Sequence, residues 1–201
     1  MIIGLTGNIA SGKSTVSHLL KELGAKVIDT DRVAREIVLP DTPALKEIVF
    51  SFGAGVLNND GTLNRAKLAT IVFDNPAARR KLEAITHPRI EEEINQQIEF
   101  FSKDNHASVL VLEVPLLIEV GWHKKVDQVW LVTVDERVQL ERLMQRDKLS
   151  PEQAKKRIHS QMPQREKMKY ANVIIDNSGT PEEVKQKLIV IWSNLINYLH
   201  D

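Results

Sequence analysis

The nine residues GNIASGKST, at positions 7–15, bring glycines, a lysine and hydroxyl side chains together at a spacing suited to holding phosphate. Gly7, Gly12, Lys13 and Ser14 occupy the fixed positions of the pattern Gly-x-x-x-x-Gly-Lys-Ser/Thr. Glycines let the backbone curl so that successive N–H groups point inward, and a helix that begins there adds its positive N-terminal end. The pattern therefore predicts a loop that binds a nucleoside triphosphate.

Each part of this loop has an expected task. We expect Lys13 to reach the β- and γ-phosphates of ATP, and the Ser14 hydroxyl to ligate Mg²⁺. The whole loop lines the nucleotide, so the predicted binding residues are Asn8, Ile9, Ala10, Ser11, Gly12, Lys13, Ser14 and Thr15. The alternative is an ordinary glycine-rich turn with a solvated lysine. The segments on either side of the loop favour the phosphate site, because an apolar run precedes it and a helical pattern follows it.

Two aspartates lie two residues apart in IDTDRVAR, directly after a predicted strand. Open α/β sheets place ligands at the carboxyl ends of their strands, so a carboxylate here can face the phosphate loop. Phosphoryl transfer to a hydroxyl needs a group that accepts or orients the hydroxyl proton, and we predict Asp31 for this task, with Asp29 as a lesser candidate. Either aspartate also suits the N-cap of the next helix. Arg35, one turn further on, either orients a substrate phosphate or pairs with Asp31.

Glu113 ends the apolar run VLVL, where nucleotide-binding proteins of this kind place an acid linked to the metal. A carboxylate among such residues is costly to bury without a partner, which favours a functional one. We therefore predict that Glu113 acts on Mg²⁺ together with Ser14.

Residues 141–169 form a charged segment in which Arg142 and Arg146 share one predicted helix face, and Gln161 and Arg165 share another. Ser150 and the residues after it indicate a helix start, so a helical hairpin is expected. Arginines here are placed to close over the transferring phosphates, although a solvated charged face is the alternative. As a set they predict a lid that excludes water, because water competes with the acceptor of a kinase.

Two other motifs favour structural interpretations. His87 in THPRIEEE precedes a proline at a predicted helix start, where capping is favoured over catalysis. LNNDGTLN, at 57–64, predicts a turn, because the alternating acids and closing glutamate of a calcium loop are missing.

Short apolar runs predict the strands that must position these residues, at 1–6, 25–29, 109–114, 126–134 and 172–176. Helical patterns alternate with them, which indicates an α/β fold with a parallel sheet. The block at 33–107 carries mostly helical signals, including separate helices AARRKLEAI and PRIEEEINQQIEFF on either side of His87, and predicts an insertion that forms one wall of a substrate site. The nucleotide-binding core is then expected at 1–32, 108–140 and 170–201, with the lid at 141–169.

Composition limits the partners and the compartment. The 201-residue chain has 27 basic and 27 acidic residues, so a nucleic acid or an anionic membrane surface is not indicated. It contains no cysteine, which suits a reducing cytoplasm. The apolar stretch at 109–120 is broken by Glu113, Pro115 and Glu119, so no transmembrane helix is expected, and neither is a signal peptide. We expect a cytoplasmic monomer or weak homo-oligomer.

Taken in order, the motifs resemble the dephospho-coenzyme A kinase family. The glycine loop alone is shared by many families. The specific signals are DTDRVAR (29–35), DGTLNR (60–65), His87-Pro88, PLLIE (115–119) and IDNSG (175–179), and the likeness runs through nearly the whole chain.

The resemblance implies a P-loop kinase fold with a five-stranded parallel sheet, a helical domain that binds the coenzyme A portion, and a lid. It implies ATP-dependent phosphorylation of the ribose 3′-hydroxyl of dephospho-coenzyme A, with Asp31 as base and Arg142 and Arg146 in the lid. The loop carrying Asn177 and Gly179 would lie near adenine, and His87 and Arg165 would contact the substrate. Relatives often have aspartate at the position of Glu113.

Two other functions are compatible with the glycine loop. One is a kinase of a nucleoside or a nucleoside monophosphate, which would not need an acceptor with a pantetheine arm. The other is a nucleotide switch or motor. The Asn-Lys-x-Asp tetrapeptide expected of a GTPase does not occur in the chain, and the balanced charge does not favour a motor on nucleic acid.

Overall fold

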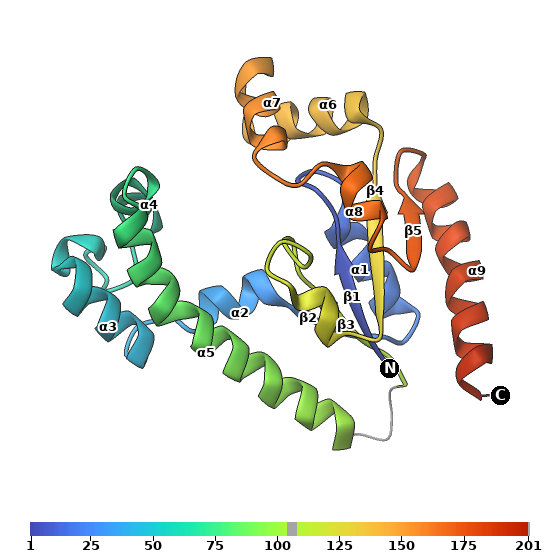
Figure 1. Cartoon of the computed structure of the whole chain (residues 1–201), viewed down its shortest axis with the longest axis horizontal. Coiled ribbons are helices and arrows are strands. Elements are labelled where there is room, and N and C mark those ends of the chain that lie inside the picture. The colour runs from blue at the N-terminus through green and yellow to red at the C-terminus, as the bar shows by residue number, and fades with distance from the viewer. Residues whose placement is uncertain (104–107, 201) are drawn as a thin grey trace. The chain divides into compact units, whose positions relative to one another are not determined.

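The computed structural model describes residues 1–103 and 108–200, which fall into two compact units. Met1–Ile28 and Asp104–Asp201 belong to the first unit, and Asp29–Lys103 forms the second. The first contains most of the sheet and the glycine loop, and the second is helical (Figure 1).

The sheet has five strands in the order β2-β3-β1-β4-β5, and its strands run parallel. They are β1 (Ile2–Thr6), β2 (Lys26–Asp29), β3 (Leu110–Glu113), β4 (Gln128–Thr133) and β5 (Val173–Asp176). Every predicted strand is present, and the predicted α/β fold with a five-stranded parallel sheet is confirmed. Because β1 is central, its carboxyl end, which leads into the glycine loop, lies between the ends of β3 and β4.

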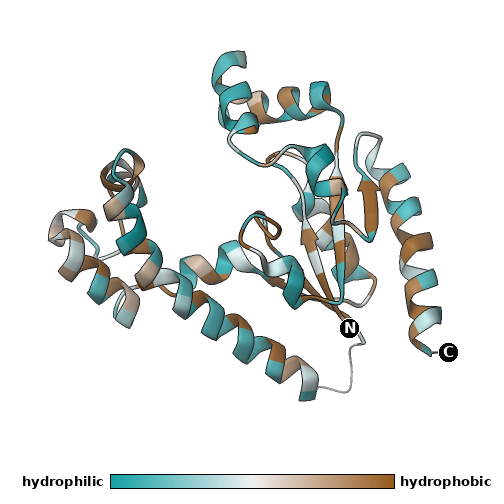
Figure 2. Cartoon of the chain, viewed as in Figure 1, coloured by the Kyte–Doolittle hydropathy of each residue, from teal (hydrophilic) through white to brown (hydrophobic). Residues whose placement is uncertain are grey.

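Strands β1, β3 and β4 are mainly apolar and buried, as expected of strands inside a parallel sheet, and Figure 2 shows the strands largely in the colour of hydrophobic residues. In register, Leu5 of β1 lies between Glu113 of β3 and Trp130 of β4. Helices α1 (Lys13–Glu22) and α9 (Pro181–His200) pack together on the sheet. Their buried residues join those of the strands in one core, which includes Leu5, Val16, Leu20, Trp130, Leu188 and Trp192.

The charged segment after β4 folds as short helices. They are α6 (Glu136–Asp147), α7 (Pro151–His159) and α8 (Gln164–Met168). A separate 3₁₀ helix, η2 (Trp122–Lys125), lies before β4. The predicted helix start at Ser150 is confirmed by a capping box, in which Ser150 and Gln153 each receive a hydrogen bond from the other's backbone N–H. Helices α6 and α7 pack against each other, as expected of a hairpin.

A buried ion pair joins α8 to the chain after β3. The side chain of Lys167 is fully buried, and its Nζ lies 2.8 Å from Oε1 of Glu119, whose side chain is 21% exposed. The two groups are not aligned for a directed hydrogen bond, so the attraction is mainly that of the charges.

Replacing Lys167 by methionine is expected to lower the free energy of unfolding by about 3 kcal/mol, because a largely buried carboxylate loses its partner. Urea unfolding followed by circular dichroism measures this change. Lys169→Met is the matched control, since Lys169 pairs with Glu166 in solvent and should matter little. Equal stability of the two variants would contradict a structural role for the buried pair, and adding Glu119→Leu to Lys167→Met should recover much of the loss.

The second unit contains the helices α2 (Thr30–Glu36), α3 (Pro43–Phe52), α4 (Arg65–Phe73) and α5 (Pro76–Lys103), with the 3₁₀ helix η1 (Ala54–Val56). Helix α5 packs against the other three α-helices. The unit has its own core, formed by Val38, Ala44, Ile48, Val56, Leu68 and Ile85.

The predicted helix start at His87 is wrong, because α5 continues through Pro88 as one helix of 28 residues. Proline cannot donate to the carbonyl one turn earlier, but neighbouring side chains bond to carbonyls of this region. The Thr86 hydroxyl donates to the Leu82 carbonyl at 3.0 Å, and Arg89 Nη1 donates to the Ile85 carbonyl at 2.6 Å. Arg89 also pairs with Glu47 of α3, so packing between helices supports the irregular turn. His87 is exposed and caps nothing.

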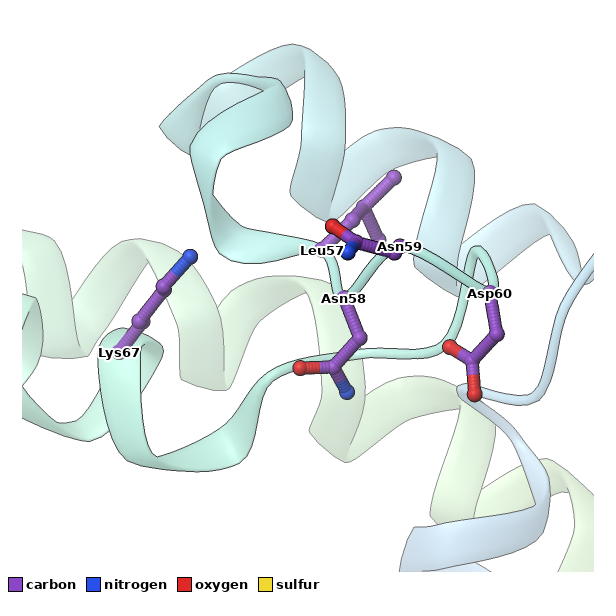
Figure 3. Close-up of a pocket in the computed structure, with 5 residues that line it drawn as sticks. All are labelled: Leu57, Asn58, Asn59, Asp60 and Lys67. Carbon is purple, nitrogen blue, oxygen red and sulfur yellow. The ribbon is translucent and has the colours of Figure 1, made fainter.

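The predicted turn at 57–64 is present. The Asp60 carboxylate accepts from the backbone N–H and the hydroxyl of Thr62, and Gly61 has a φ of 79°, which favours glycine. The Thr62 hydroxyl holds the pKa of Asp60 below its ordinary value. Asp60 and Lys67 are among the residues that line a shallow hollow on this unit (Figure 3). No helix among the described residues is long and apolar enough to cross a membrane.

Candidate active site

The glycine loop runs from the end of β1 to the start of α1, and both of its motif glycines are required by space. Gly12 has a φ of 86°, and a Cβ atom there would collide with Nδ2 of Asn177. A Cβ atom at Gly7 would lie 2.6 Å from both Ser11 Oγ and the Val132 carbonyl oxygen. The backbone therefore packs closely against β4 and the chain after β5.

The start of α1 suits an anion. No side chain caps this helix, and its first turn contains no acidic residue. Its N-terminal N–H groups and positive dipole end are thus available to a ligand. Nearby, Asn8 Oδ1 and Ser11 Oγ are buried and have no hydrogen-bond partner among the described residues. Buried polar atoms are rarely left unpaired, so the loop fits a bound polar group such as a polyphosphate.

The predicted magnesium ligands also fit a metal that is shared with a nucleotide. Ser14 is exposed at the start of α1, and Glu113 is nearly buried at the carboxyl end of β3, the strand beside β1. Mg²⁺ is usually held by one or two protein oxygens plus substrate phosphates, so a cage of acids is not needed. Within residues 1–103 and 108–200, no three His, Cys, Asp or Glu side chains form such a cage.

The loop after β5 is attached directly to the glycine loop. Asn177 Nδ2 donates to the Ser11 carbonyl at 2.7 Å. The next residue, Ser178, donates its hydroxyl to Asp176 at 2.6 Å and accepts from the Asp135 N–H at 2.8 Å. The Ser178 hydroxyl also holds the pKa of Asp176 below its ordinary value. These bonds place Asn177 beside the loop, with Gly179 two residues further on.

The two predicted lid arginines have different surroundings. Arg142 Nη1 lies 3.9 Å from the position of a Cβ atom built on Gly12, so its guanidinium is beside the glycine loop. It is half-buried and makes no ion pair in the described part of the chain. Arg146 instead bonds to Asp147 at 2.8 and 3.2 Å, and Asp147 also accepts from Arg157 at 2.7 Å. Bonding between Arg146 and Asp147 raises the pKa of the arginine and lowers that of the aspartate.

The aspartates after β2 have different surroundings in the second unit. Asp29 is the N-cap of α2, and its carboxylate accepts from the N–H groups of Asp31 and Arg32. The carboxylate of Asp31 is exposed and makes no hydrogen bond or ion pair to the residues that the structure describes. Arg35 is also exposed and does not pair with Asp31, which removes one of its two predicted tasks.

The other two predicted substrate residues are also exposed. His87 lies in α5, and Arg165 lies in α8 of the first unit.

Glutamines around the glycine loop were not among the predicted site residues. Gln139 and Gln161 bond to its backbone, and Gln164 bonds to both backbone groups of Val134 at 3.0 and 3.2 Å. Gln139 is buried although it belongs to a charged helix, and the residues around it in the sequence do not indicate this burial. The predicted helix face shared by Gln161 and Arg165 is wrong, because Gln161 lies between α7 and α8.

Comparisons with known proteins agree over almost the whole chain. The family model described as dephospho-CoA kinase matches residues 1–183. A dephospho-CoA kinase from Moorella thermoacetica is 47% identical over 200 residues, which cover 100% of this chain and 94% of the relative. Among solved structures, TT1252 from Thermus thermophilus has a TM-score of 0.80 at 35% identity, covering 97% of both chains. A dephospho-CoA kinase from Campylobacter jejuni has a TM-score of 0.74 at 33% identity, covering 96% of both.

Proposed function

The chain belongs to the dephospho-CoA kinase family, and we propose that it transfers the γ-phosphoryl group of ATP to the ribose 3′-hydroxyl of dephospho-coenzyme A. This reaction is the last step of coenzyme A biosynthesis. The observation that carries the function is the family match over residues 1–183, which includes both the glycine loop and the DTDRVAR motif. ATP is the phosphoryl donor that a kinase of this family uses.

The glycine loop holds the triphosphate of ATP in this proposal. Backbone N–H groups from Asn8 to Thr15 and the N-terminus of α1 surround the phosphates, and Lys13 reaches the β- and γ-phosphates. Mg²⁺ neutralises phosphate charge when bound, and Ser14 and Glu113 are the residues that would hold it. The loop with Asn177 and Gly179 lies near adenine, supported by the bond from Asn177 to Ser11.

Asp31 accepts the proton of the 3′-hydroxyl as that oxygen attacks the γ-phosphorus and the bond to the β,γ-bridging oxygen breaks. The different surroundings of the two aspartates in DTD support this role for Asp31. Asp29 caps a helix, while the Asp31 carboxylate makes no bond to the described residues.

Arg142 stabilises the charge on the transferring phosphoryl group. A half-buried guanidinium without an ion pair, next to the phosphate loop, is suited to binding an anion. Arg146 belongs to the same helix, and its ion pair with Asp147 braces α6 against Arg157 of α7. The segment at 141–169 acts as the lid that keeps water from the phosphoryl group.

The helical block at 33–107 binds the coenzyme A portion of the acceptor, with Arg35 and His87 as substrate contacts, and Arg165 contacts the substrate from the lid. Residues 104–107 of that block lie outside the described residues. The side chains of Arg35, His87 and Arg165 are exposed, which supports these assignments. We further propose that the protein acts in the cytoplasm as a monomer or weak homo-oligomer, without nucleic acid or membrane partners, in keeping with its balanced charge.

Mass spectrometry of reactions with Mg-ATP tests the acceptor. Dephospho-coenzyme A, adenosine and AMP are supplied in parallel. We expect one product, heavier by one phosphate and co-migrating with coenzyme A, from dephospho-coenzyme A alone. Phosphorylation of adenosine or AMP instead would favour the nucleoside or nucleotide kinase and remove the substrate assignment of the helical block. ATP hydrolysis that is independent of any acceptor would favour the switch or motor.

Lys13→Ala is expected to lower kcat about 10²- to 10³-fold, because a charge aimed at the phosphates is lost. Coupled measurement of ADP release gives the rate. Lys21→Ala, which changes an exposed lysine in the last turn of the same helix, is the matched control and should retain activity. A Lys13 variant as active as the Lys21 variant would remove Lys13 from the phosphate site.

A further inference from the structure

One peptide segment of the glycine loop is held from outside by two glutamine side chains. Gln139 Nε2 donates to the Ile9 carbonyl at 2.8 Å, and the Ile9 N–H donates to Gln161 Oε1 at 2.7 Å. Both the donor and the acceptor of this residue are therefore used by side chains that lie more than a hundred positions away in the chain.

The residue after this clamp is strained. Ala10 has a φ of 61°, a left-handed conformation that costs free energy for a residue with a Cβ atom. A strained conformation of this kind persists only where the surrounding contacts hold the backbone in place. The C=O and N–H of a trans peptide point in opposite directions, so fixing the Ile9 carbonyl on Gln139 also directs the Ala10 N–H away from Gln139. The bond from Gln139 thus fixes the direction of the Ala10 N–H, which is one of the hydrogen-bond donors of the loop.

The second glutamine belongs to the segment proposed as the lid. Gln161 lies between α7 and α8, and the Met162 carbonyl beside it accepts from Asn8 Nδ2 at 3.0 Å. Two adjacent lid residues therefore bond to two adjacent residues of the glycine loop. Gln139 lies in α6, the helix that also carries Arg142.

We propose that Gln139 and Gln161 are positioning residues that hold the two peptide groups on either side of Ile9, and with them the strained conformation of Ala10, and that Gln161 couples the lid segment to the glycine loop. The inference rests on the proposed function only for its effect on turnover. The clamp itself is a property of the protein without ligands. Neither glutamine touches the reacting atoms; both act through the backbone that binds phosphate.

Amide hydrogen exchange of the nucleotide-free protein, followed by NMR, tests the clamp without any substrate. Gln161→Ala is expected to speed exchange of the Ile9 amide about 10-fold, because its acceptor is lost. Gln161→Glu should restore protection, since a carboxylate still accepts from the N–H. Gln186→Ala, which removes a surface glutamine that bonds only within α9, is the matched control. Unchanged Ile9 exchange in Gln161→Ala would overturn the proposal.

Replacement by glutamate should be tolerated at Gln161 but not at Gln139. Gln139→Glu cannot donate to the Ile9 carbonyl, so it should behave like Gln139→Ala and not like wild type. In steady-state kinetics we expect Gln161→Ala to lower kcat about 10-fold with little change in the KM for dephospho-coenzyme A. Because both side chains hold the backbone of the same residue, Ile9, the effects of the two alanine variants should combine to less than their product.

Two results would count against the coupled clamp. Independent, fully multiplicative effects of the two variants would mean that the glutamines do not act as a unit. A rise in KM with unchanged kcat would mean that they serve binding alone. If Gln139→Ala does not fold, because that side chain is only 3% exposed, the half-buried Gln161 series decides the question. If the acceptor proved to be another molecule, the exchange results would stand unchanged.

Discussion

Arg142→Ala is expected to lower kcat about 10³-fold or more, whereas Arg146→Ala should lower it far less. The two arginines are one turn apart on α6 and look equivalent in the sequence. Only Arg142 lies beside Gly12 with its guanidinium unpaired among the described residues. Arg146 is already engaged by Asp147. A guanidinium that meets the transferring phosphoryl group stabilises charge that develops in the transition state, so its loss should appear in kcat.

Single-turnover and steady-state rates with saturating Mg-ATP and dephospho-coenzyme A measure this difference. Arg146→Ala is the matched control, since it removes the same side chain from the same helix. Thermal unfolding of both variants checks that the helix survives. Loss of turnover in Arg146→Ala as large as that in Arg142→Ala would contradict the assignment, and would mean that the lid rearranges before it closes.

Asp31→Asn is expected to lower kcat about 10²- to 10⁴-fold, the range for loss of a general base, while ATP binding is retained. Asparagine has the same shape as aspartate but cannot take up the hydroxyl proton. Isothermal titration with Mg-ATP and turnover with dephospho-coenzyme A give the two quantities separately.

Asp29→Asn is the control for this prediction. Asparagine is as good an N-cap as aspartate, so α2 should remain intact and turnover should stay close to that of wild type. If Asp29→Asn is the inactive variant and Asp31→Asn is active, the base is the residue that also caps the helix. Activity in both variants would place the proton acceptor outside the DTD motif.

The candidate active site is assembled from groups that lie far apart in the chain. The glycine loop is bonded to Gln139 of α6, to Gln161 and Met162 before α8, and to Asn177 after β5. All of these contacts lie on the first unit, so the loop and its supports form one compact structure. If the loop binds phosphate as proposed, a substitution in any of these elements can therefore alter that binding without touching the nucleotide.

Local patterns were sufficient for the elements whose signals are local. The strand, glycine loop and helix at 1–24 follow from residue types and spacing, because two glycines, an apolar run and a helical period each constrain the adjacent backbone. The strands were found for the same reason, since continuous apolar runs suit a sheet covered on both faces. The turn at 57–64 follows from Asn58, Asp60 and Gly61.

Tertiary packing decided the rest. Pro88 locally favours a break, yet α5 continues, with bonds from Thr86 and Arg89 to carbonyls of the preceding turn and packing against other helices. The sequence pattern left Asp29 and Asp31 open as caps, and left Arg142 and Arg146 equivalent; the structure shows which aspartate caps α2 and which arginine meets the glycine loop. Gln139 and Gln161 bond to Ile9 although they lie 130 and 152 residues away in the chain, and a local sequence pattern cannot predict such a contact. Side chains that act by meeting distant backbone become visible only when the chain has folded.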